Sequence, residues 1–339
     1  MRAVALGAEG RLEVVVKDRP TAGPEDVIVS VERCGICGSD LHLRASGLLP
    51  LGAVMGHEFA GTIVETGAEA PVPLQPGRRV SVLPARRCGT CDACRAGKGH
   101  LCPAQAFSAI GLGVNDGAYA EYVRVPAASC HVLPEHMNAE QGALVEPYAV
   151  GLHAVARSRA AGGGAAAVGI IGAGPIGLMC LAALRHSGVA DVIVAERSPS
   201  RAMVAEAMGA TVVGDARRLA PAARPPLEVV FDATGDVSTP ALALEAVEPG
   251  GQVVLVGTPG PGQAMPMPGL LWVVKEVEVT PSIAYTDQEF TTAVAAVAAG
   301  ALDADLMVSD VRPLDAAERS FAELAQPDAP VKVMLAPEA

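Results

Sequence analysis

The segment that most constrains the fold of this chain is a glycine-rich turn between a buried strand and a helix. Gly172, Gly174 and Gly177 form the pattern G-x-G-x-x-G after the apolar run Val168–Ile171, and Ile176–His186 continues as a helix. The first glycine allows a tight turn, the second allows a ligand to approach the backbone, and the third allows close helix–strand packing. The N–H groups at the helix start would then face a pyrophosphate. We therefore expect this turn to bind a dinucleotide through Gly172, Gly174, Pro175, Ile176 and Gly177.

Strands and helices alternate after this turn. Val192–Ala195 is predicted as a strand and Ser200–Met208 as a helix, and Val229–Asp232 and Val253–Val256 are predicted as further strands with a helix near Ala241–Val247 between them. Such alternation implies a parallel sheet with right-handed crossovers. The fold class indicated for this half is α/β, with a doubly wound parallel sheet of the Rossmann type.

The second predicted strand ends in Glu196, at the place where a ribose-binding acid is expected, about 20 residues after the turn. A carboxylate there can accept hydrogen bonds from the ribose hydroxyls and would repel a 2′-phosphate, so Glu196 favours NAD over NADP. Arg197 and Arg201 follow closely and could pair with such a phosphate, or else lie on a solvated loop. We include Arg201 among the candidate coenzyme contacts.

The first 130 residues or so have a different pattern. Short apolar stretches, such as Val27–Val31, Thr62–Glu65 and Arg79–Leu83, are separated by Gly and Pro, which indicates a β-rich domain. Near residue 138 the pattern changes, because Asn138 and Gln141 resemble a capping box in front of an apolar helix.

Four cysteines lie within 15 residues of this first part. Cys88, Cys91, Cys94 and Cys102 have the spacing C-x-x-C-x-x-C-x7-C. Four thiolates on short loops can form a closed tetrahedral zinc shell, which stabilises a loop and does not catalyse. An iron–sulfur cluster is the alternative, but the ferredoxin spacing differs in its last gap.

A second and open metal site is indicated by Cys37 together with His57 and Glu58. A Cys, a His and a carboxylate can hold zinc and leave a position for water or substrate. Glu146 is a further candidate, because an acid in so apolar a stretch needs a partner. Pro147 disfavours the helical conformation of the residue before it, so we expect a kink that could turn Glu146 out of its helix.

Composition excludes several classes of function. The chain has 25 Lys and Arg against 37 Asp and Glu, a net charge of −12, which argues against nucleic acid as a partner. Eight cysteines without a secretory signal indicate metal binding or catalysis in the cytoplasm and not disulfides. The uncharged run Ala160–Leu184 is long enough to span a membrane, but it contains the glycine-rich turn, so we expect no membrane association.

Taken together, these motifs resemble the zinc-dependent medium-chain dehydrogenases of the alcohol dehydrogenase superfamily. The pattern Gly56-His57-Glu58-x2-Gly61-x5-Gly67-x2-Ala70 is similar to the zinc signature of that family, and the four cysteines and the coenzyme turn follow in the family's order. The stretches Ala143–Pro147 and Ile283–Asp287 look most like the sorbitol and butanediol dehydrogenase branch. The resemblance implies a GroES-like, β-rich catalytic domain with both zinc sites in residues 1–150, a Rossmann domain in 151–283, and a return to the catalytic domain in 284–339.

The resemblance also implies roles for single residues. Cys37 and His57 would bind the catalytic zinc, with Glu58, Glu146 or a water completing the shell. Ser39 would hydrogen-bond the substrate oxygen, and His42 would pass the proton outwards. Cys34 is expected to pack in the core.

The implied activity is hydride transfer between a nicotinamide and a secondary alcohol, which would be a polyol, a diol or a hydroxylated biosynthetic intermediate, giving its ketone. The family further implies two zinc ions per chain and a homo-oligomer, a tetramer or dimer. Two alternatives are a zinc-free enone or quinone reductase of the same superfamily and a non-enzymatic zinc-ribbon module. The scarce aromatic side chains are expected either in the substrate pocket or in the core, namely Phe107, Tyr119, Trp272 and Tyr285.

Overall fold

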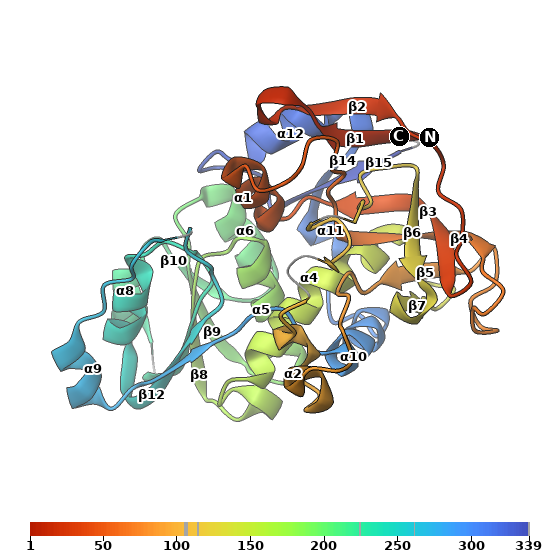
Figure 1. Cartoon of the computed structure of the whole chain (residues 1–339). Helices are drawn as coiled ribbons and strands as arrows, with labels where there is room; N and C mark the ends of the chain where they lie inside the picture. The colour runs from red at the N-terminus through yellow and green to blue at the C-terminus, as the bar shows by residue number, and fades with distance from the viewer. Residues whose placement is uncertain (105–107, 114, 224, 261, 338–339) are drawn as a thin grey trace. The chain divides into compact units, whose positions relative to one another are not determined.

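A computed structural model of the chain describes residues 1–104, 108–113, 115–223, 225–260 and 262–337. It divides into two compact units (Figure 1). Unit 1 comprises Met1–Glu146, Thr286–Ala299 and Val308–Ala339, and unit 2 comprises Pro147–Tyr285 and Gly300–Met307. Each unit is described by itself below.

Unit 2 is built on a six-stranded parallel sheet with the order β10-β9-β8-β11-β12-β13. The strand order runs outward in both directions from β8, which creates a topological switch point beside the end of that strand. All five residues of β8 are buried, as expected for a central strand of a parallel sheet. The strands are β8 (Ala167–Ile171), β9 (Asp191–Ala195), β10 (Thr211–Val213), β11 (Leu227–Asp232), β12 (Val247–Leu255) and β13 (Glu278–Pro281).

The predicted α/β class and doubly wound sheet are thereby confirmed. The strands β10 and β13 were not predicted, because both are short, lie at the sheet edges and include exposed residues, so they lack a buried apolar run. The helices of unit 2 are α5 (Pro175–His186), α6 (Pro199–Ala207), α7 (Leu219–Ala222), α8 (Thr239–Ala246), α9 (Gly269–Lys275) and α11 (Ala304–Met307).

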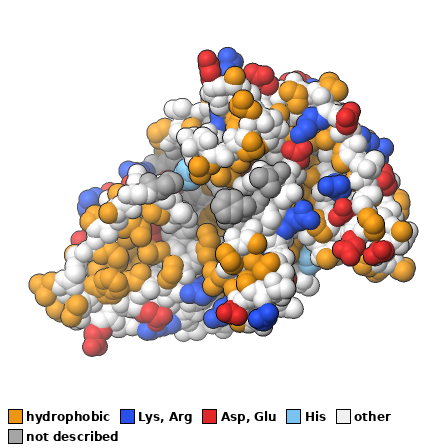
Figure 2. Space-filling model, in the orientation of Figure 1, with side chains coloured by type: hydrophobic (Ala, Val, Ile, Leu, Met, Phe, Trp, Pro, Cys, Tyr) orange, Lys and Arg blue, Asp and Glu red, His pale blue; other side chains and the backbone are white. Residues whose placement is uncertain are grey.

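Helix α9 is unusual in presenting apolar side chains to solvent. Leu270, Val273 and Val274 are 80%, 75% and 70% exposed. Figure 2 shows hydrophobic side chains gathered over this part of unit 2. The strand nearest to α9 in sequence is β13, which forms one end of the described sheet. Contiguous apolar surface of this kind is typical of a protein interface.

Unit 1 is β-rich, as predicted. Its main sheet has the order β14-β15-β3-β4-β5-β7, with β6 also paired to β3, and a separate hairpin consists of β1 (Arg2–Leu6) and β2 (Leu12–Val16). The main strands are β3 (Asp26–Gly35), β4 (Glu58–Thr66), β5 (Arg79–Val82), β6 (Tyr122–Pro126), β7 (Cys130–Val132), β14 (Val308–Pro313) and β15 (Lys332–Ala336). The helices are α1 (Gly38–Ser46), α2 (Asp92–Arg95), α10 (Asp287–Ala298) and α12 (Ala317–Leu324).

The C-terminal strand of the chain returns to the sheet formed near its start. Strand β15 pairs antiparallel with β3, with Met334 opposite Gly35 and Leu335 opposite Cys34. This register places residues from the two ends of the sequence around the segment that leads into α1. Figure 1 shows β15, in dark blue, beside the orange strands of the sheet.

Helix α4 (Ala139–Ala156) belongs to both units. The predicted capping box is confirmed, because Asn138 N–H donates to Gln141 Oε1 at 2.9 Å and Gln141 N–H donates to Asn138 Oδ1 at 2.8 Å. The expectation that Pro147 would turn Glu146 out of the helix is wrong, since α4 runs unbroken across it. The apolar residues around Glu146 are almost all buried, and their packing outweighs the local preference that the proline imposes. No helix in the described ranges is both long and apolar enough to cross a membrane.

Candidate functional site

Three side chains of different chemistry converge where β3, α1 and β4 meet in unit 1. Cys37 directly precedes α1, His57 directly precedes β4, and Glu58 is the first residue of that strand. Ligand atoms of these three residues all lie within 4.8 Å of one another. A thiolate, an imidazole and a carboxylate are a donor set that zinc accepts in sites with an open position. The residues present therefore fit a catalytic metal.

Asp40 connects two of these three residues, and the sequence had not singled it out. Its side chain is fully buried, and its Oδ2 accepts hydrogen bonds from Cys37 N–H at 3.0 Å and from Tyr119 O–H at 2.6 Å. Its Oδ1 lies 3.3 Å from His57 Nδ1. Burial lowers the pKa of His57, but Asp40 outweighs this effect and the pKa is raised. Neither Asp40 Oδ1 nor His57 Nδ1 makes a hydrogen bond among the described residues, so Asp40 acts on Nδ1 through the charge contact, and the other ring nitrogen is left to face a ligand.

Lys332 is the partner of Glu58. Its Nζ donates to Glu58 Oε1 and Oε2 at 2.9 and 2.7 Å and to the carbonyl oxygen of Ile36 at 3.1 Å. Both side chains are 1% exposed. Burial lowers the pKa of Lys332, whereas Glu58 and, more weakly, Glu146 raise it, and the net effect is a raised pKa. The signal that could have revealed this pair is a lysine inside the otherwise apolar strand sequence around it, which needs a buried anion.

The remaining candidates of this site lie nearby but in different environments. Glu146 is buried, but its carboxylate does not belong to the close donor group found among the described residues. Its negative charge contributes weakly to the raised pKa of Lys332. Ser39 Oγ lies 3.4 Å from His57 Nε2. His42 is exposed on α1, three residues from Ser39 and thus on the same helix face.

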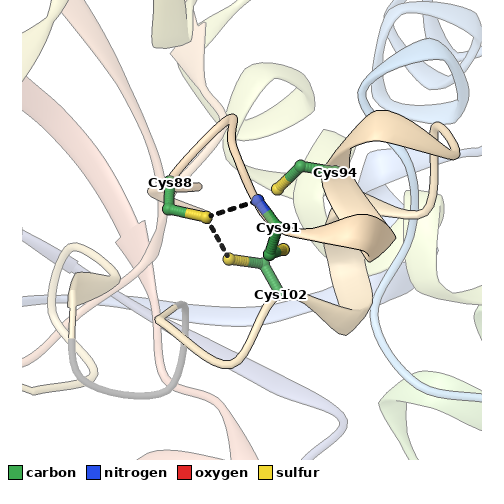
Figure 3. Close-up of side chains that lie close together, drawn as sticks. All are labelled: Cys88, Cys91, Cys94 and Cys102. Carbon is green, nitrogen blue, oxygen red and sulfur yellow. Dashed lines mark hydrogen bonds between the residues drawn. The ribbon is translucent and has the colours of Figure 1, made fainter.

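The four-cysteine segment forms a second cluster of ligand atoms. The thiols of Cys88, Cys91, Cys94 and Cys102 all lie within 4.8 Å of one another, and they face a common centre (Figure 3). Cys102 Sγ is 3.6 Å from Cys88 Sγ, and Cys91 N–H donates to Cys88 Sγ at 3.3 Å. Hydrogen bonds from Thr90 and Cys91 lower the pKa of Cys88 to about 6, which favours the thiolate form that binds metal. All eight cysteines of the chain are free of disulfides.

The geometry of the glycine-rich turn in unit 2 explains why each of its three positions is a glycine. Gly172 has a φ of +92°, which disfavours any other residue. A Cβ at Gly177 would overlap the carbonyl oxygen of Gly172, whereas a Cβ at Gly174 would meet no described atom within 4 Å. Space is therefore open in front of Gly174, at the N-terminus of α5, where Pro175 is the first helical residue and Ile176 follows. An anion placed there would face the helix dipole and its unpaired N–H groups.

Glu196 lies at the end of β9 and contacts this turn. Its Oε2 accepts a hydrogen bond from Ala173 N–H at 2.7 Å, and its Oε1 accepts from the N–H groups of Arg197 and Ser198, each at 2.7 Å. The carboxylate is thus held beside the turn. Arg201 is half-buried in α6.

The loop after β11, the neighbour of β8 in the sheet, lies beside the glycine-rich turn. Asp232, buried at the end of β11, accepts hydrogen bonds from Thr234 N–H at 3.1 Å, from Thr234 O–H at 2.8 Å and from Thr239 O–H at 2.7 Å. The side chain of Thr234 packs against Gly172. These bonds order the loop after β11, and Thr234 in that loop contacts the glycine-rich turn.

The aromatic side chains divide between core and surface. Tyr119 and Tyr285 are buried, and Trp272 is 38% exposed on α9, with its Nε1–H donating to the carbonyl oxygen of Val277 at 2.6 Å. Phe107 lies outside the described residues.

Comparison with known proteins agrees with this architecture. Residues 23–135 match the model of the alcohol dehydrogenase GroES-like domain, and residues 175–299 match the model of the zinc-binding dehydrogenases. A curated relative, "Probable D-xylulose reductase A" of Aspergillus clavatus, is 32% identical and aligns over 93% of this chain and 92% of its own length.

Two solved structures are similar over nearly the whole chain. A zinc-binding dehydrogenase from Sinorhizobium meliloti 1021, bound to NADP, has a TM-score of 0.91 and 32% identity, and covers 99% of each chain. The 2R,3R-butanediol dehydrogenase of Bacillus subtilis has a TM-score of 0.87 and 30% identity, again over 99% of each chain.

The fold and these matches define an oxidoreductase with a GroES-like domain and a Rossmann domain. The chain belongs to the zinc-dependent medium-chain dehydrogenases of the alcohol dehydrogenase superfamily. The non-enzymatic zinc-ribbon alternative is therefore discarded.

Proposed function

We propose that this chain is a zinc-dependent NAD(P) oxidoreductase that interconverts a secondary alcohol and its ketone. The observation that carries the proposal is the convergence of a half-buried Cys37 with the buried His57 and Glu58 in one cluster. A reductase that works without zinc has no need of a thiol, an imidazole and a carboxylate at such a point. The relatives named for D-xylulose and for 2R,3R-butanediol support a polyol, a diol or a similarly hydroxylated intermediate as the substrate class.

In this proposal Cys37 and His57 hold the zinc, and Glu58, Glu146 or a water completes its shell. Zinc, when bound, acts as a Lewis acid that makes the alcohol proton easier to remove. Ser39 Oγ accepts that proton as it gives up its own hydroxyl proton, which His42, exposed on the same helix face, passes to solvent. Asp40 orients the imidazole of His57, and Lys332 holds the carboxylate of Glu58. The nicotinamide supplies the hydride acceptor.

For the coenzyme we propose NAD in preference to NADP. The carboxylate of Glu196 is held beside the turn by three N–H groups, where a 2′-phosphate would meet its negative charge. The turn itself, from Gly172 through Gly174, Pro175 and Ile176 to Gly177, would receive the pyrophosphate, and Arg201 would lie near the ribose. Replacing Glu196 by Ala should weaken NAD binding more than NADP binding, measured by titration calorimetry. The opposite ranking would refute this assignment.

The four-cysteine cluster is proposed as a closed structural zinc site, so that each chain holds two zinc ions. We also propose that unit 1 is the catalytic domain and unit 2 the coenzyme domain, close to the predicted boundaries at residues 150 and 283. The structure assigns 300–307 to unit 2, whereas the sequence had placed them in the catalytic domain.

The assembly proposed is a homo-oligomer, a dimer or tetramer. The exposed apolar side chains of α9 and the end strand β13 support this, because a second copy of the chain could cover them. Replacing Val273 by Asp should then shift the mass measured by light scattering towards the monomer. We propose a reducing compartment, the cytoplasm, because none of the eight cysteines is paired in a disulfide.

The test of the activity is reduction of NAD⁺ by the purified protein with a panel of secondary alcohols, polyols and amino-cyclitols. Cys37→Ser should abolish turnover and remove about one zinc ion per chain, while the four-cysteine zinc stays. As a matched control, Cys130→Ser changes a half-buried thiol of β7 outside both clusters and should keep both ions. An unchanged rate in Cys37→Ser would overturn the proposal.

A further inference from the structure

Tyr119 packs against Gly56, the residue that precedes His57. Its side chain is fully buried, and Gly56 has a φ of +100°. A Cβ at Gly56 would lie 2.6 and 2.8 Å from two ring carbons of Tyr119. The ring therefore lies against the backbone of Gly56. It also packs edge-on against the ring of Phe321, with the two ring centroids 6.0 Å apart.

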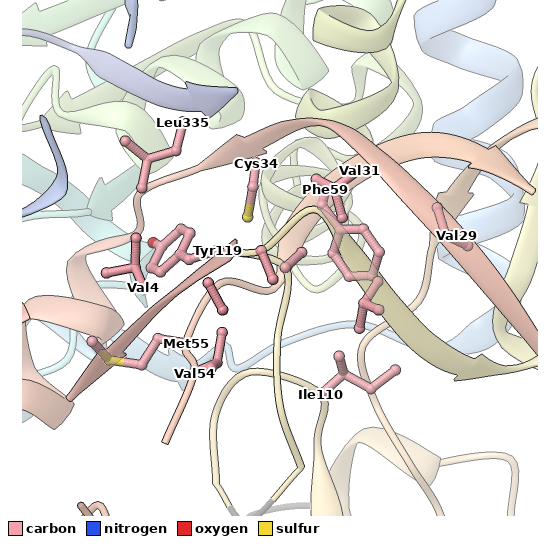
Figure 4. Packing of buried hydrophobic residues seen from close by; sticks show 14 of the residues in the cluster. Val4, Val29, Val31, Cys34, Val54, Met55, Phe59, Ile110, Tyr119 and Leu335 are labelled. Carbon is pink, nitrogen blue, oxygen red and sulfur yellow. The ribbon is translucent and has the colours of Figure 1, made fainter. Parts of the chain in front are cut away.

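The surroundings of this ring leave it little freedom. Figure 4 shows Tyr119 among apolar side chains that include Val4, Cys34 and Met55. Its own backbone is fixed as well, because Tyr119 N–H donates to Met55 O at 3.0 Å and Val4 N–H donates to Tyr119 O at 2.7 Å. A side chain held on all sides can place its terminal oxygen with little loss of entropy on forming a bond.

The hydroxyl of Tyr119 reaches a single carboxylate. It lies 2.6 Å from Asp40 Oδ2, and its distance to the carbonyl oxygen of Gly35 is 3.3 Å. The neutral hydroxyl has one proton to donate, and the charged acceptor forms the shorter and stronger bond. Asp40 in turn meets Cys37 N–H through Oδ2 and His57 Nδ1 through Oδ1. Tyr119 is thus the outer end of a relay in which a hydrogen bond joins the hydroxyl to the carboxylate and a 3.3 Å ion-pair contact joins the carboxylate to the imidazole.

We infer that Tyr119 is a positioning residue of the catalytic metal centre, which acts on His57 through Asp40. This inference rests on the proposed function, because it assumes that His57 binds the zinc. Direct partners of a metal-binding histidine typically change metal affinity or activity by 10–100-fold when they are removed, and Tyr119 acts one step further out, through Asp40, so its effect belongs at the lower end of that range. The inference uses both parts of the side chain, since the ring fixes the backbone at Gly56 and the hydroxyl fixes the carboxylate.

The test uses Tyr119→Phe, which keeps the ring and removes only the hydroxyl. The matched control is Tyr122→Phe, since Tyr122 is a half-buried residue of β6 whose ring contacts Arg19 and not the metal cluster. Each purified holoenzyme is mixed with a chelator that changes colour on binding zinc, and the release of the two ions is followed in time. The four-cysteine zinc, identified by its loss in Cys102→Ser, is the internal reference.

We expect Tyr119→Phe to release the Cys37–His57 zinc about tenfold faster than the native enzyme, while the four-cysteine zinc leaves at the native rate. The visible spectrum of the cobalt-substituted enzyme should shift in Tyr119→Phe and stay native in Tyr122→Phe. Release at the native rate, or equal acceleration of both ions, would overturn the role of Tyr119. If Cys37→Ser holds as much zinc as the native enzyme, the proposed function itself fails. This result differs from a failure of the role of Tyr119 alone, in which Cys37→Ser loses zinc but Tyr119→Phe releases it at the native rate.

Discussion

The buried pair formed by Lys332 and Glu58 allows a quantitative prediction. Replacing Lys332 by Met keeps the length and apolar stem of the side chain but removes its charge and three hydrogen bonds, two to Glu58 and one to the carbonyl oxygen of Ile36. Because both charged groups are 1% exposed, solvent cannot replace the lost partner. Breaking a buried ion pair at one end costs about 3–5 kcal/mol, mainly because the other charge is left uncompensated. We expect Lys332→Met to destabilise unit 1 by that amount.

The assay is urea unfolding of the coenzyme-free protein after a chelator has removed the Cys37–His57 zinc, because bound zinc would itself compensate the charge of Glu58. Unfolding is followed by far-ultraviolet circular dichroism. The variant Glu58→Gln/Lys332→Met should recover part of the loss, because it buries no unpaired charge, and the cycle with both single variants gives the interaction energy. Lys332→Arg is the charge-retaining control. A Lys332→Met protein within about 1 kcal/mol of the native free energy of unfolding, or a double variant no more stable than Lys332→Met, would refute this reasoning.

Three further predictions concern separate parts of the molecule. Gly174→Ala should leave the melting temperature unchanged, since its Cβ meets no described atom within 4 Å. It should weaken NADH binding at least about tenfold in a fluorescence titration, because the added Cβ lies where the pyrophosphate would approach the backbone. Native affinity would contradict this. Cys102→Ser should lower the zinc content from about two to about one ion per chain by elemental analysis and keep NADH affinity, and retention of both ions would contradict the closed four-thiolate site. Burial raises the pKa of Glu318, but hydrogen bonds from Leu12 N–H and Arg44 outweigh this effect, so the net pKa is lowered. The ionised carboxylate therefore stabilises the fold at neutral pH, and this stabilisation disappears as the pH falls below about 4. The melting temperatures of Glu318→Gln and the native protein should therefore differ at pH 7 and converge in acid, and a constant difference would show that the carboxylate charge is not responsible.

The features that could be predicted were those in which a few neighbouring residues interact. The turn at Gly172–Gly177 and the capping box at Asn138 and Gln141 are set within one turn of chain, so sequence spacing is enough. The short spacing of the four cysteines likewise brings their thiols together whatever the rest of the fold does. The expectation at Pro147 was wrong for the opposite reason, because a local preference there is opposed by the packing of a whole apolar helix.

The sequence by itself determined the family, the two kinds of domain and the candidate metal ligands, because a motif of fixed residue spacing identifies each of them. Only the tertiary structure decided which groups surround those ligands. Lys332 meets Glu58 because β15 pairs with β3, and Tyr119 meets Asp40 because its segment packs against Gly56. Lys332 and Glu58 are 274 residues apart in the chain, and Tyr119 and Asp40 are 79 apart. A buried charge must find a partner, but the register of distant strands decides which residue that partner is.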